Sequence, residues 1–266
     1  MNRISLTSEL ESVVADIVEV SGYLWQKGWA EHSGGNMSID VTGLVPKSGG
    51  EFNRFAEKRV KHYPGLAEQC FFVTLTGSRF RDIARRPEKN LLLIRIAPEL
   101  NGYQLLWGGE GPEKIPTSEF ISHLKIHNFM RKNNLPQNVF LHTHPTHLIA
   151  LSNIEEYSKE ENANNLLYRM HPELTVFLPE GIGLAHYCRP GSEALADATV
   201  ASLQNHRVVL WEKHGCTAIG SNILEAFDLI DIVNKAAEIF FICKSAGFQP
   251  QGLNNDQRAQ LTTDVP

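Results

Sequence analysis

Three histidines fall within six positions of "VFLHTHPTHLIAL" (139–151), where a strand-like run passes into a helix-like run. Side chains at positions i and i+2 of a strand point to the same face, so His142 and His144 should lie side by side, as two ligands of one metal ion do. His147 comes after Pro145, where a helix should begin, and its side chain should point elsewhere. The cluster therefore requires a fold in which a strand ends at a site that other segments can reach.

A third ligand is available in "VVLWEKHGCTAIG", where His214 follows an apolar strand and precedes Gly215. Three neutral histidines with one open position are typical of catalytic zinc, whereas a structural zinc site uses four ligands, usually including cysteine. Cys216 fits a small core residue better than a ligand. A single histidine near a sheet edge is more often a hydrogen-bonded polar group, but this combination favours a metal site.

"HTHPTH" nearly matches the H-x-H-x-D-H pattern of metallo-β-lactamase-like hydrolases. Thr146 stands where that pattern has an aspartate ligand, and this departure counts against a hydrolase. A hydrolase stays as an alternative among metal enzymes.

Composition excludes several classes of protein. The chain has 266 residues, 42% hydrophobic and 21% charged, as in a soluble globular protein. Its apolar runs are shorter than the roughly 20 residues of a membrane helix, and "MNRISLTSELES" lacks the apolar segment of a signal peptide. Four scattered cysteines suit reduced thiols in a cytoplasm. The net charge of −5 argues against nucleic acid as the main partner, but not against a small anionic substrate.

The order of the predicted elements indicates an α/β protein. Ser8 and Glu11 form a capping box that predicts a first helix, and an alternating strand should follow "SGGN". Strands are predicted at "CFFVTLT", "LLLIRIA", "YQLLW", "VFLH", "TVFL" and "RVVLW", and helices from "PTSEF" to about 133 and at 145–153, 160–169, 192–205 and about 222–246. Strands and helices do not alternate regularly, which disfavours a doubly wound parallel sheet. We expect one domain over residues 1–266, with a polar surface insertion at about 42–69 and a polar tail at about 248–266 that is partly disordered or forms one short helix.

Glu119, in "KIPTSEFISHLKIHNF", should fall in the first turn of a helix. A carboxylate there interacts favourably with the helix dipole by about 0.3–1 kcal/mol, or it could serve as a base beside the metal. "SGGN" (33–36) and "TGS" (76–78) are small-residue turns of the kind that bind anions. Together with Thr117 and Ser118 they suggest a phosphate pocket near the metal.

The ordered set "GGN", "TGS", "PTSE", "HTHPTH" and "KHG" resembles the class II aldolase family, the zinc sugar-phosphate aldolases and pentulose-phosphate 4-epimerases. The longer stretches "WQKGWAEHSGGNMS", "VFLPEGIG" and "RPGSEALADAT" extend the resemblance to roughly residues 10–247. It implies a central, largely antiparallel β-sheet flanked by helices, in a cyclic homotetramer with sites at the subunit interfaces.

The resemblance also implies an activity and roles for individual residues. The motifs are most similar to those of members that cleave L-rhamnulose 1-phosphate reversibly to dihydroxyacetone phosphate and L-lactaldehyde. It implies one Zn²⁺ per subunit held by His142, His144 and His214, with Glu119 as the base and Glu173 reaching a neighbouring subunit's site to handle the aldehyde end. The residues implied to bind the substrate phosphate are Gly35, Asn36, Gly77, Ser78, Thr117 and Ser118.

Three alternatives stay open within this resemblance. The chain could cleave another ketose phosphate, it could be a sugar-phosphate 4-epimerase, or it could be a non-catalytic domain like the head of adducin. The three histidines and Glu119 disfavour the last, because a scaffold needs neither a metal nor a base.

Overall fold

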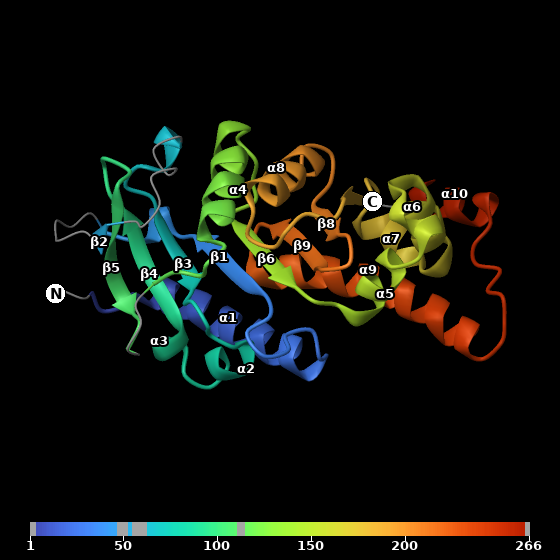
Figure 1. Cartoon of the computed structure of the whole chain (residues 1–266), viewed down its shortest axis with the longest axis horizontal. Coiled ribbons are helices and arrows are strands. Elements are labelled where there is room, and N and C mark those ends of the chain that lie inside the picture. Colours follow the sequence, from blue (N-terminus) through green and yellow to red (C-terminus); the bar gives the residue numbers. More distant parts are fainter. Residues whose placement is uncertain (1–3, 47–52, 55–62, 111–114, 264–266) are drawn as a thin grey trace. The chain divides into compact units, whose positions relative to one another are not determined.

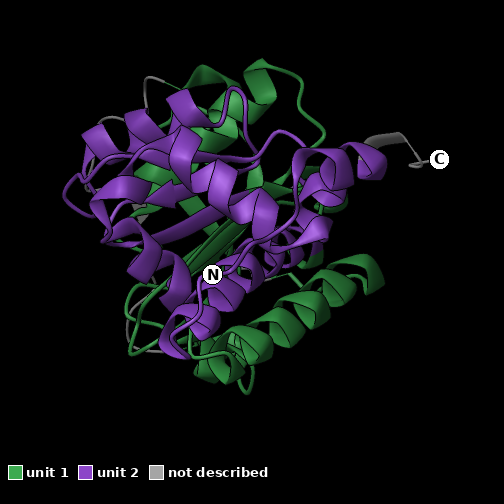
Figure 2. Ribbon diagram, turned by 90° about the vertical axis from the view of Figure 1, so that its right-hand side faces the viewer, with its two compact units in different colours: residues 1–143, 219–224 green, residues 144–218, 225–266 purple. Residues whose placement is uncertain are grey.

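The computed structural model describes residues 4–46, 53–54, 63–110 and 115–263. The chain folds into two compact units (Figure 2). Unit 1 comprises residues 1–143 and 219–224, and unit 2 comprises residues 144–218 and 225–266. Figure 1 labels the helices and most of the strands.

Unit 1 is built on strands in the order β2-β5-β4-β3-β1-β6, and every pairing between them is antiparallel. Their bounds are β1 (Asn36–Asp40), β2 (Asn53–Arg54), β3 (Cys70–Thr74), β4 (Leu91–Ile96), β5 (Gly102–Gly108) and β6 (Val139–Thr143). The predicted strands "CFFVTLT", "LLLIRIA", "YQLLW" and "VFLH" are thereby confirmed. All six residues of β4 are buried, which explains its nearly continuous apolar sequence.

The helices of unit 1 are α1 (Ser8–Gln26), α2 (Phe80–Ile83), α3 (Pro87–Asn90) and α4 (Phe120–Lys132), with 3₁₀ turns η1 (Thr42–Leu44) and η3 (Pro64–Leu66). The predicted Ser8–Glu11 capping box is wrong, because Thr7 is the N-cap and its hydroxyl accepts from the amide of Leu10. The helix itself is confirmed, and its stripe of fully buried residues includes Leu10, Ile17 and Leu24.

One face of the unit 1 sheet carries the core that fixes the start of α4. Alternate residues of β3, β4 and β5, such as Phe71 and Ile94, pack with Phe120 and Leu124 of α4. Tyr63 and Leu66 join the same core, so the prediction of a surface insertion at 42–69 is wrong for this end of it. Residues 47–52 and 55–62 of the insertion lie outside the described residues. Because Phe120 is buried beside the sheet, Glu119 is fixed at the sheet's end.

Unit 2 contains α5 (Thr146–Ser152), η4 (Glu155–Ser158), α6 (Glu160–Met170), α7 (Pro172–Phe177), β7 (Ile182–Ala185), α8 (Glu193–Ser202), β8 (Val208–Trp211) and α10 (Asn255–Thr263), with most of α9 (Ile223–Ser245) and of β9 (Gly215–Gly220). Strand β7 is parallel to β8, and β8 is antiparallel to β9. The predicted strand "TVFL" is wrong: it lies largely in α7, which begins at Pro172. Proline is favoured at the first position of a helix, and a four-residue apolar run does not distinguish helix from strand.

The predicted fold class is confirmed: the protein is α/β, and its β-sheet structure is largely antiparallel. The single domain over 1–266 stays a prediction. Among the described residues, no helix combines the length and the apolar content that crossing a bilayer requires.

Gly108, the last residue of β5, should tolerate no side chain. Its φ is +82°, and a Cβ there would lie 2.1 Å from the carbonyl oxygen of Leu91, a backbone atom that β4 holds in place. Gly28, with φ +71°, has nothing within 4 Å of such a Cβ and serves as the matched control. We expect Gly28→Ala to cost about 1 kcal/mol for the left-handed conformation alone, and Gly108→Ala to cost about 3 kcal/mol or more. Urea unfolding of both variants measures the difference, and equal losses would contradict the steric argument.

Candidate active site

Two of the predicted ligands lie at the end of strand β6. His142 is its fourth residue and His144 follows its last, with Thr143 between them. The hydroxyl of Thr143 donates to the carbonyl oxygen of Trp29 at 2.6 Å, so this buried side chain points away from the face of its two neighbours. The alternation predicted from the H-x-H spacing is therefore present.

A tight hairpin positions the third ligand. Trp211, which ends β8, pairs with Gly215, which begins β9, leaving Glu212, Lys213 and His214 in the turn. Lys213 adopts φ +60°, the left-handed residue that three-residue hairpin loops require, and its amide donates to Ser152 Oγ at 2.8 Å. The indole ring of Trp211 lies 5.1 Å from the imidazole of His214, centroid to centroid.

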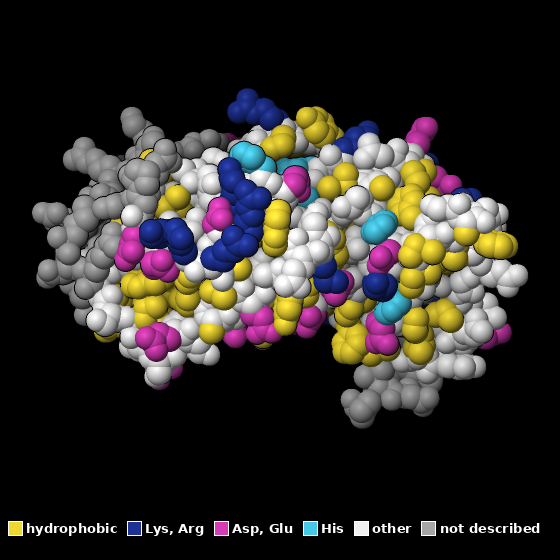
Figure 3. All heavy atoms as spheres, turned by 90° about the horizontal axis from the view of Figure 1, so that it is seen from below, with side chains coloured by type: hydrophobic (Ala, Val, Ile, Leu, Met, Phe, Trp, Pro, Cys, Tyr) yellow, Lys and Arg dark blue, Asp and Glu magenta, His cyan; other side chains and the backbone are white. Residues whose placement is uncertain are grey.

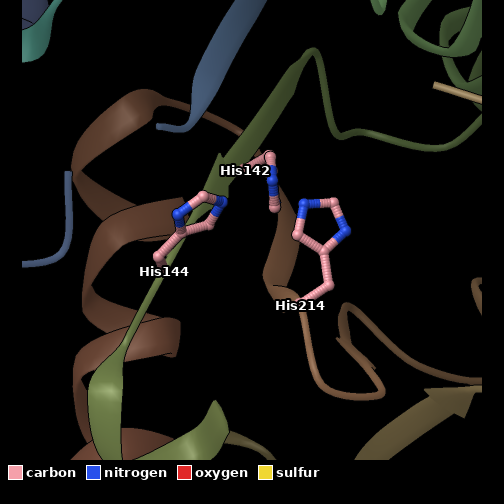
Figure 4. Close-up of side chains that lie close together, drawn as sticks. All are labelled: His142, His144 and His214. Atoms are coloured by element: carbon pink, nitrogen blue, oxygen red, sulfur yellow. The ribbon is translucent and has the colours of Figure 1, made fainter. Parts of the chain in front are cut away.

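The three histidines form a group that could hold a metal ion. One ring nitrogen of each of His142, His144 and His214 lies within 4.8 Å of the others (Figure 4). Two nitrogens bound to one tetrahedral zinc ion lie about 3.4 Å apart, so the most widely separated pair would have to close by up to about 1.4 Å when the ion binds. Three imidazoles with no thiolate are also the donor set of catalytic zinc. The residues present therefore fit the ion.

His147 and Cys216 are not members of that group. His147 is the second residue of α5, where its ring lies 6.1 Å from that of Phe241. Cys216 is fully buried, and burial raises the pKa of its thiol, so it is held as the neutral core residue that the sequence predicted.

Backbone hydrogen bonds join the "TGS" loop to the segment that precedes Glu119. The amide of Thr117 donates to Thr74 O and that of Thr76 to Ile115 O, each at 2.9 Å, on either side of a bridge between Leu75 and Pro116. Gly77 and Ser78 therefore lie beside Thr117 and Ser118. Ser118 and Gly77 are exposed, while Thr117 is buried.

The "SGGN" loop reaches the same place through a side chain. Asn36, the first residue of β1, donates from Nδ2 to Oε2 of Glu119 at 2.7 Å. Gly35 before it has φ +78°, and a Cβ there would lie 2.6 Å from the carbonyl oxygen of His142 and 2.8 Å from the Phe80 ring. Only glycine permits this close approach, which keeps the loop against the strand that carries His142.

Glu119 is the N-cap residue of α4, and the prediction that it lies in the first turn is wrong by one position. Its backbone carbonyl accepts from the amides of Ser122 and His123. Its carboxylate, however, is directed to Asn36. Glu173 is exposed in the first turn of α7 in unit 2, and its predicted role at a neighbouring subunit's site stays a prediction.

Behind Glu119 lies a set of buried polar residues that the sequence analysis missed. His123 Nε2 lies 2.5 Å from Asn36 Oδ1, and Ser38 Oγ lies 2.8 Å from His123 Nδ1 and 2.7 Å from His127 Nε2. The signal was present in "EFISHLKIH", because residues spaced four apart on a helix share a face. Ser38 likewise shares a strand face with Asn36.

Burial keeps both of these histidines neutral. Desolvation, reinforced by His127, lowers the pKa of His123 well below its ordinary value. Desolvation is also the main cause that lowers the pKa of His127 from 6.5 to about 4. The rings are fixed by aromatic neighbours, since His123 packs edge-on to Phe140 and His127 against Phe71, each at 4.8 Å between centroids.

We expect this pair to make the protein acid-labile between pH 6.5 and 4. In that range the unfolded chain protonates His127 and the folded chain does not, so the unfolded state binds more protons and stability falls as the pH falls. The loss from His127 is on the order of 3 kcal/mol at pH 4, since one pKa unit corresponds to about 1.4 kcal/mol. Urea unfolding at several pH values, with a chelator present throughout, measures it. His127→Gln should flatten the profile, and an unchanged profile would contradict the assignment.

Comparison with known proteins places the chain among the aldolases. The family model described as Class II Aldolase and Adducin N-terminal domain matches residues 15–241. Rhamnulose-1-phosphate aldolase of Bacteroides thetaiotaomicron is 38% identical over 264 residues, which cover 98% of this chain and 95% of that one. The enzyme of the same name from Pectobacterium carotovorum is 31% identical, covering 93% and 91% of the two chains.

A solved structure agrees with these sequence matches. The sugar-phosphate aldolase from Thermotoga maritima superposes with a TM-score of 0.77 and 30% identity, covering 92% of this chain and all of that one. The match leaves out less than a tenth of this chain.

Proposed function

The chain belongs to the class II aldolase and adducin N-terminal domain family, and from this premise we propose that it is a zinc-dependent aldolase that cleaves L-rhamnulose 1-phosphate reversibly to dihydroxyacetone phosphate and L-lactaldehyde. One observation carries the proposal: ring nitrogens of His142, His144 and His214 lie within 4.8 Å of one another, the donor set of a catalytic zinc ion. The 38% identity over nearly the whole chain to a rhamnulose-1-phosphate aldolase supports the substrate.

The three histidines would hold the zinc ion through neutral ring nitrogens. Zinc bound there would supply a Lewis acid for the negative charge that develops on the ketose oxygens when the carbon–carbon bond breaks.

Glu119 would move the proton that completes the reaction. In cleavage, the bond between C3 and C4 of the ketose breaks, its electron pair enters the C2 carbonyl, and C3 then takes a proton to become the hydroxymethyl carbon of dihydroxyacetone phosphate. Glu119 is the proposed donor in this direction and the base in the reverse direction. Glu173 of a neighbouring subunit is proposed to take the proton of the C4 hydroxyl, which becomes the aldehyde oxygen.

The loops around Glu119 would orient the substrate by its phosphate. Ser78, Thr117 and Ser118 would offer hydroxyls, and the amides of Gly35 and Gly77 would offer further donors, as phosphate oxygens require. The hydrogen bonds that place the 76–78 loop beside residues 115–117 support a single binding region. Asn36 presents its amide oxygen to His123, so only its N–H groups face an anion. Holding the phosphate would set C3 beside Glu119.

A homotetramer in the cytoplasm is part of the proposal. Exposed apolar side chains such as Phe177, Ile242 and Phe248 support burial against further subunits. All four cysteines are free thiols, which agrees with a reducing compartment. On the face seen in Figure 3, basic and acidic side chains are interspersed rather than gathered into one basic surface, which supports a small-molecule partner and not a nucleic acid.

The decisive experiment is an assay of a panel of ketose phosphates for both cleavage and epimerisation. We expect release of dihydroxyacetone phosphate from L-rhamnulose 1-phosphate to exceed that from L-fuculose 1-phosphate, and no epimerisation of L-ribulose 5-phosphate. Activity should disappear on chelation and return on adding zinc. A protein that stays inactive with zinc, or one that epimerises but does not cleave, would overturn the proposal.

A further inference from the structure

The carboxylate of Glu119 stands at the end of a continuous hydrogen-bonded chain inside unit 1. The chain runs from His127 through Ser38, His123 and Asn36 to Glu119, with successive distances of 2.7, 2.8, 2.5 and 2.7 Å. Its inner members are buried: Ser38 and His123 are 0% exposed, His127 1% and Asn36 8%. Neutral buried polar groups of this kind are stable only when each is paired with the correct partner.

The carboxylate fixes the direction of every hydrogen bond in the chain. An ionised Glu119 can only accept, so Asn36 must turn its Nδ2 toward it and its Oδ1 toward His123. That oxygen can also only accept, so His123 must carry its proton on Nε2. Because burial keeps this ring neutral, its Nδ1 is an acceptor.

Ser38 completes the same assignment. Its hydroxyl must donate to Nδ1 of His123, and its oxygen then accepts from Nε2–H of His127. The alternative tautomer of His123 would place two acceptors, its Nε2 and Asn36 Oδ1, 2.5 Å apart. Rotating the amide of Asn36 to avoid this would place its oxygen against the carboxylate. The row of hydrogen bonds from His127 to Glu119 therefore has one self-consistent arrangement.

We infer that His123, held in one tautomer by Ser38, is a positioning residue that locks Asn36 and thereby fixes the Glu119 carboxylate. The inference rests on the proposed role of Glu119 as the base. The His123 ring bonds to Asn36 and not to the Glu119 carboxylate, so the ring acts on the reaction only through the Asn36 amide. A carboxylate that must reach one carbon atom loses rate steeply when its position is relaxed, by up to about 100-fold for a displacement near 1 Å.

Two substitutions of His123 separate positioning from packing. In His123→Gln the side-chain amide nitrogen can occupy the place of Nε2 and still donate to Asn36 Oδ1. In His123→Met the volume is retained and the donor is lost. Both variants lose the hydrogen bond with Ser38 and should lose stability, but only the second frees Asn36.

We expect His123→Met to reduce kcat by about 10- to 100-fold, with KM for L-rhamnulose 1-phosphate changed by less than about threefold and zinc content unchanged. The exchange of the hydroxymethyl hydrogen of dihydroxyacetone phosphate with deuterated water, which reports the proton transfer alone, should fall in parallel. His123→Gln should stay within about threefold of the parent in both assays. Met130→Ala, a buried change elsewhere on α4, controls for loosening of the helix and should leave kcat within the same range. Equal losses in the Gln and Met variants would overturn the inference.

An independent measurement avoids activity altogether. Ring ¹⁵N chemical shifts of His123 should show a protonated Nε2 and an unprotonated Nδ1 from pH 5 to 8, and Ser38→Ala should mix the two tautomers. The opposite tautomer in the parent protein would overturn the inference, whatever the enzyme assay shows. A parent protein that shows the expected tautomer but cleaves no ketose phosphate would overturn the proposed function. The catalytic role inferred for the hydrogen bonds between His127 and Glu119 would then fail with it.

Discussion

Glu119→Gln should retain its zinc and lose about 10²- to 10⁴-fold in kcat, the range in which a positioned acid or base acts. Glutamine has the shape of glutamate and its side-chain oxygen can still accept from Asn36 Nδ2, so the surrounding hydrogen bonds survive. It cannot take or give a proton at the reacting carbon. The change therefore removes one chemical step and little else.

Three measurements check this result: kcat for cleavage, the exchange of the hydroxymethyl hydrogen with deuterated water, and zinc per subunit by atomic emission. Glu99→Gln, at an exposed site in the same unit, is the matched control and should behave like the parent. Near-normal exchange in Glu119→Gln would remove Glu119 as the base. Loss of zinc along with activity would instead make its carboxylate a metal ligand.

His214→Ala should reduce both the zinc content and the turnover to near zero. Two imidazoles do not retain a zinc ion against the water and chelators of an ordinary buffer, whereas three with an open position do. His214 is the best of the three to replace, because it lies in a hairpin turn and is only partly buried. Replacing His142, which is 1% exposed, would also remove buried packing.

His147→Ala is the control that decides the ligand set. It should keep about one zinc per subunit, because the group of close ring nitrogens does not include His147. Should His147→Ala lose the metal while His214→Ala keeps it, the ligands would be the three histidines of "HTHPTH" and the site would resemble that of a hydrolase. Zinc content alone distinguishes the two cases.

Local sequence patterns were enough to predict the strands that carry apolar runs and the ligands on them. The H-x-H spacing predicted that His142 and His144 share a face, because a strand has a period of two residues. The pattern failed at "TVFL", where four apolar residues fit either state, and it missed β7, whose four residues include Gly183. Neither error affected the site.

The meeting of the loops could not be predicted from local patterns. A backbone hydrogen bond joins Thr74 and Thr117 across more than forty residues of chain, and such pairings depend on the order of strands in the sheet. Asn36 is still farther from Glu119 and His123 in sequence, and its contacts with them depend on the packing of α4. The small-residue turns suggested a shared phosphate pocket, and the resemblance to a known family assigned Asn36 and Glu119 to the site, but neither pointed to His123.

The single direction of the hydrogen bonds behind Glu119 has a stereochemical consequence. With the hydrogen bonds in the direction that the ionised carboxylate sets, Oε2 accepts from Asn36, and Oε1 is the oxygen left to take a proton. As long as this direction is kept, a proton that Glu119 picks up resides on Oε1 and later leaves from the same oxygen. Deuterium from the solvent should enter just one of the two enantiotopic positions of the hydroxymethyl group, so the handedness of that label is set by an amide that never touches the proton.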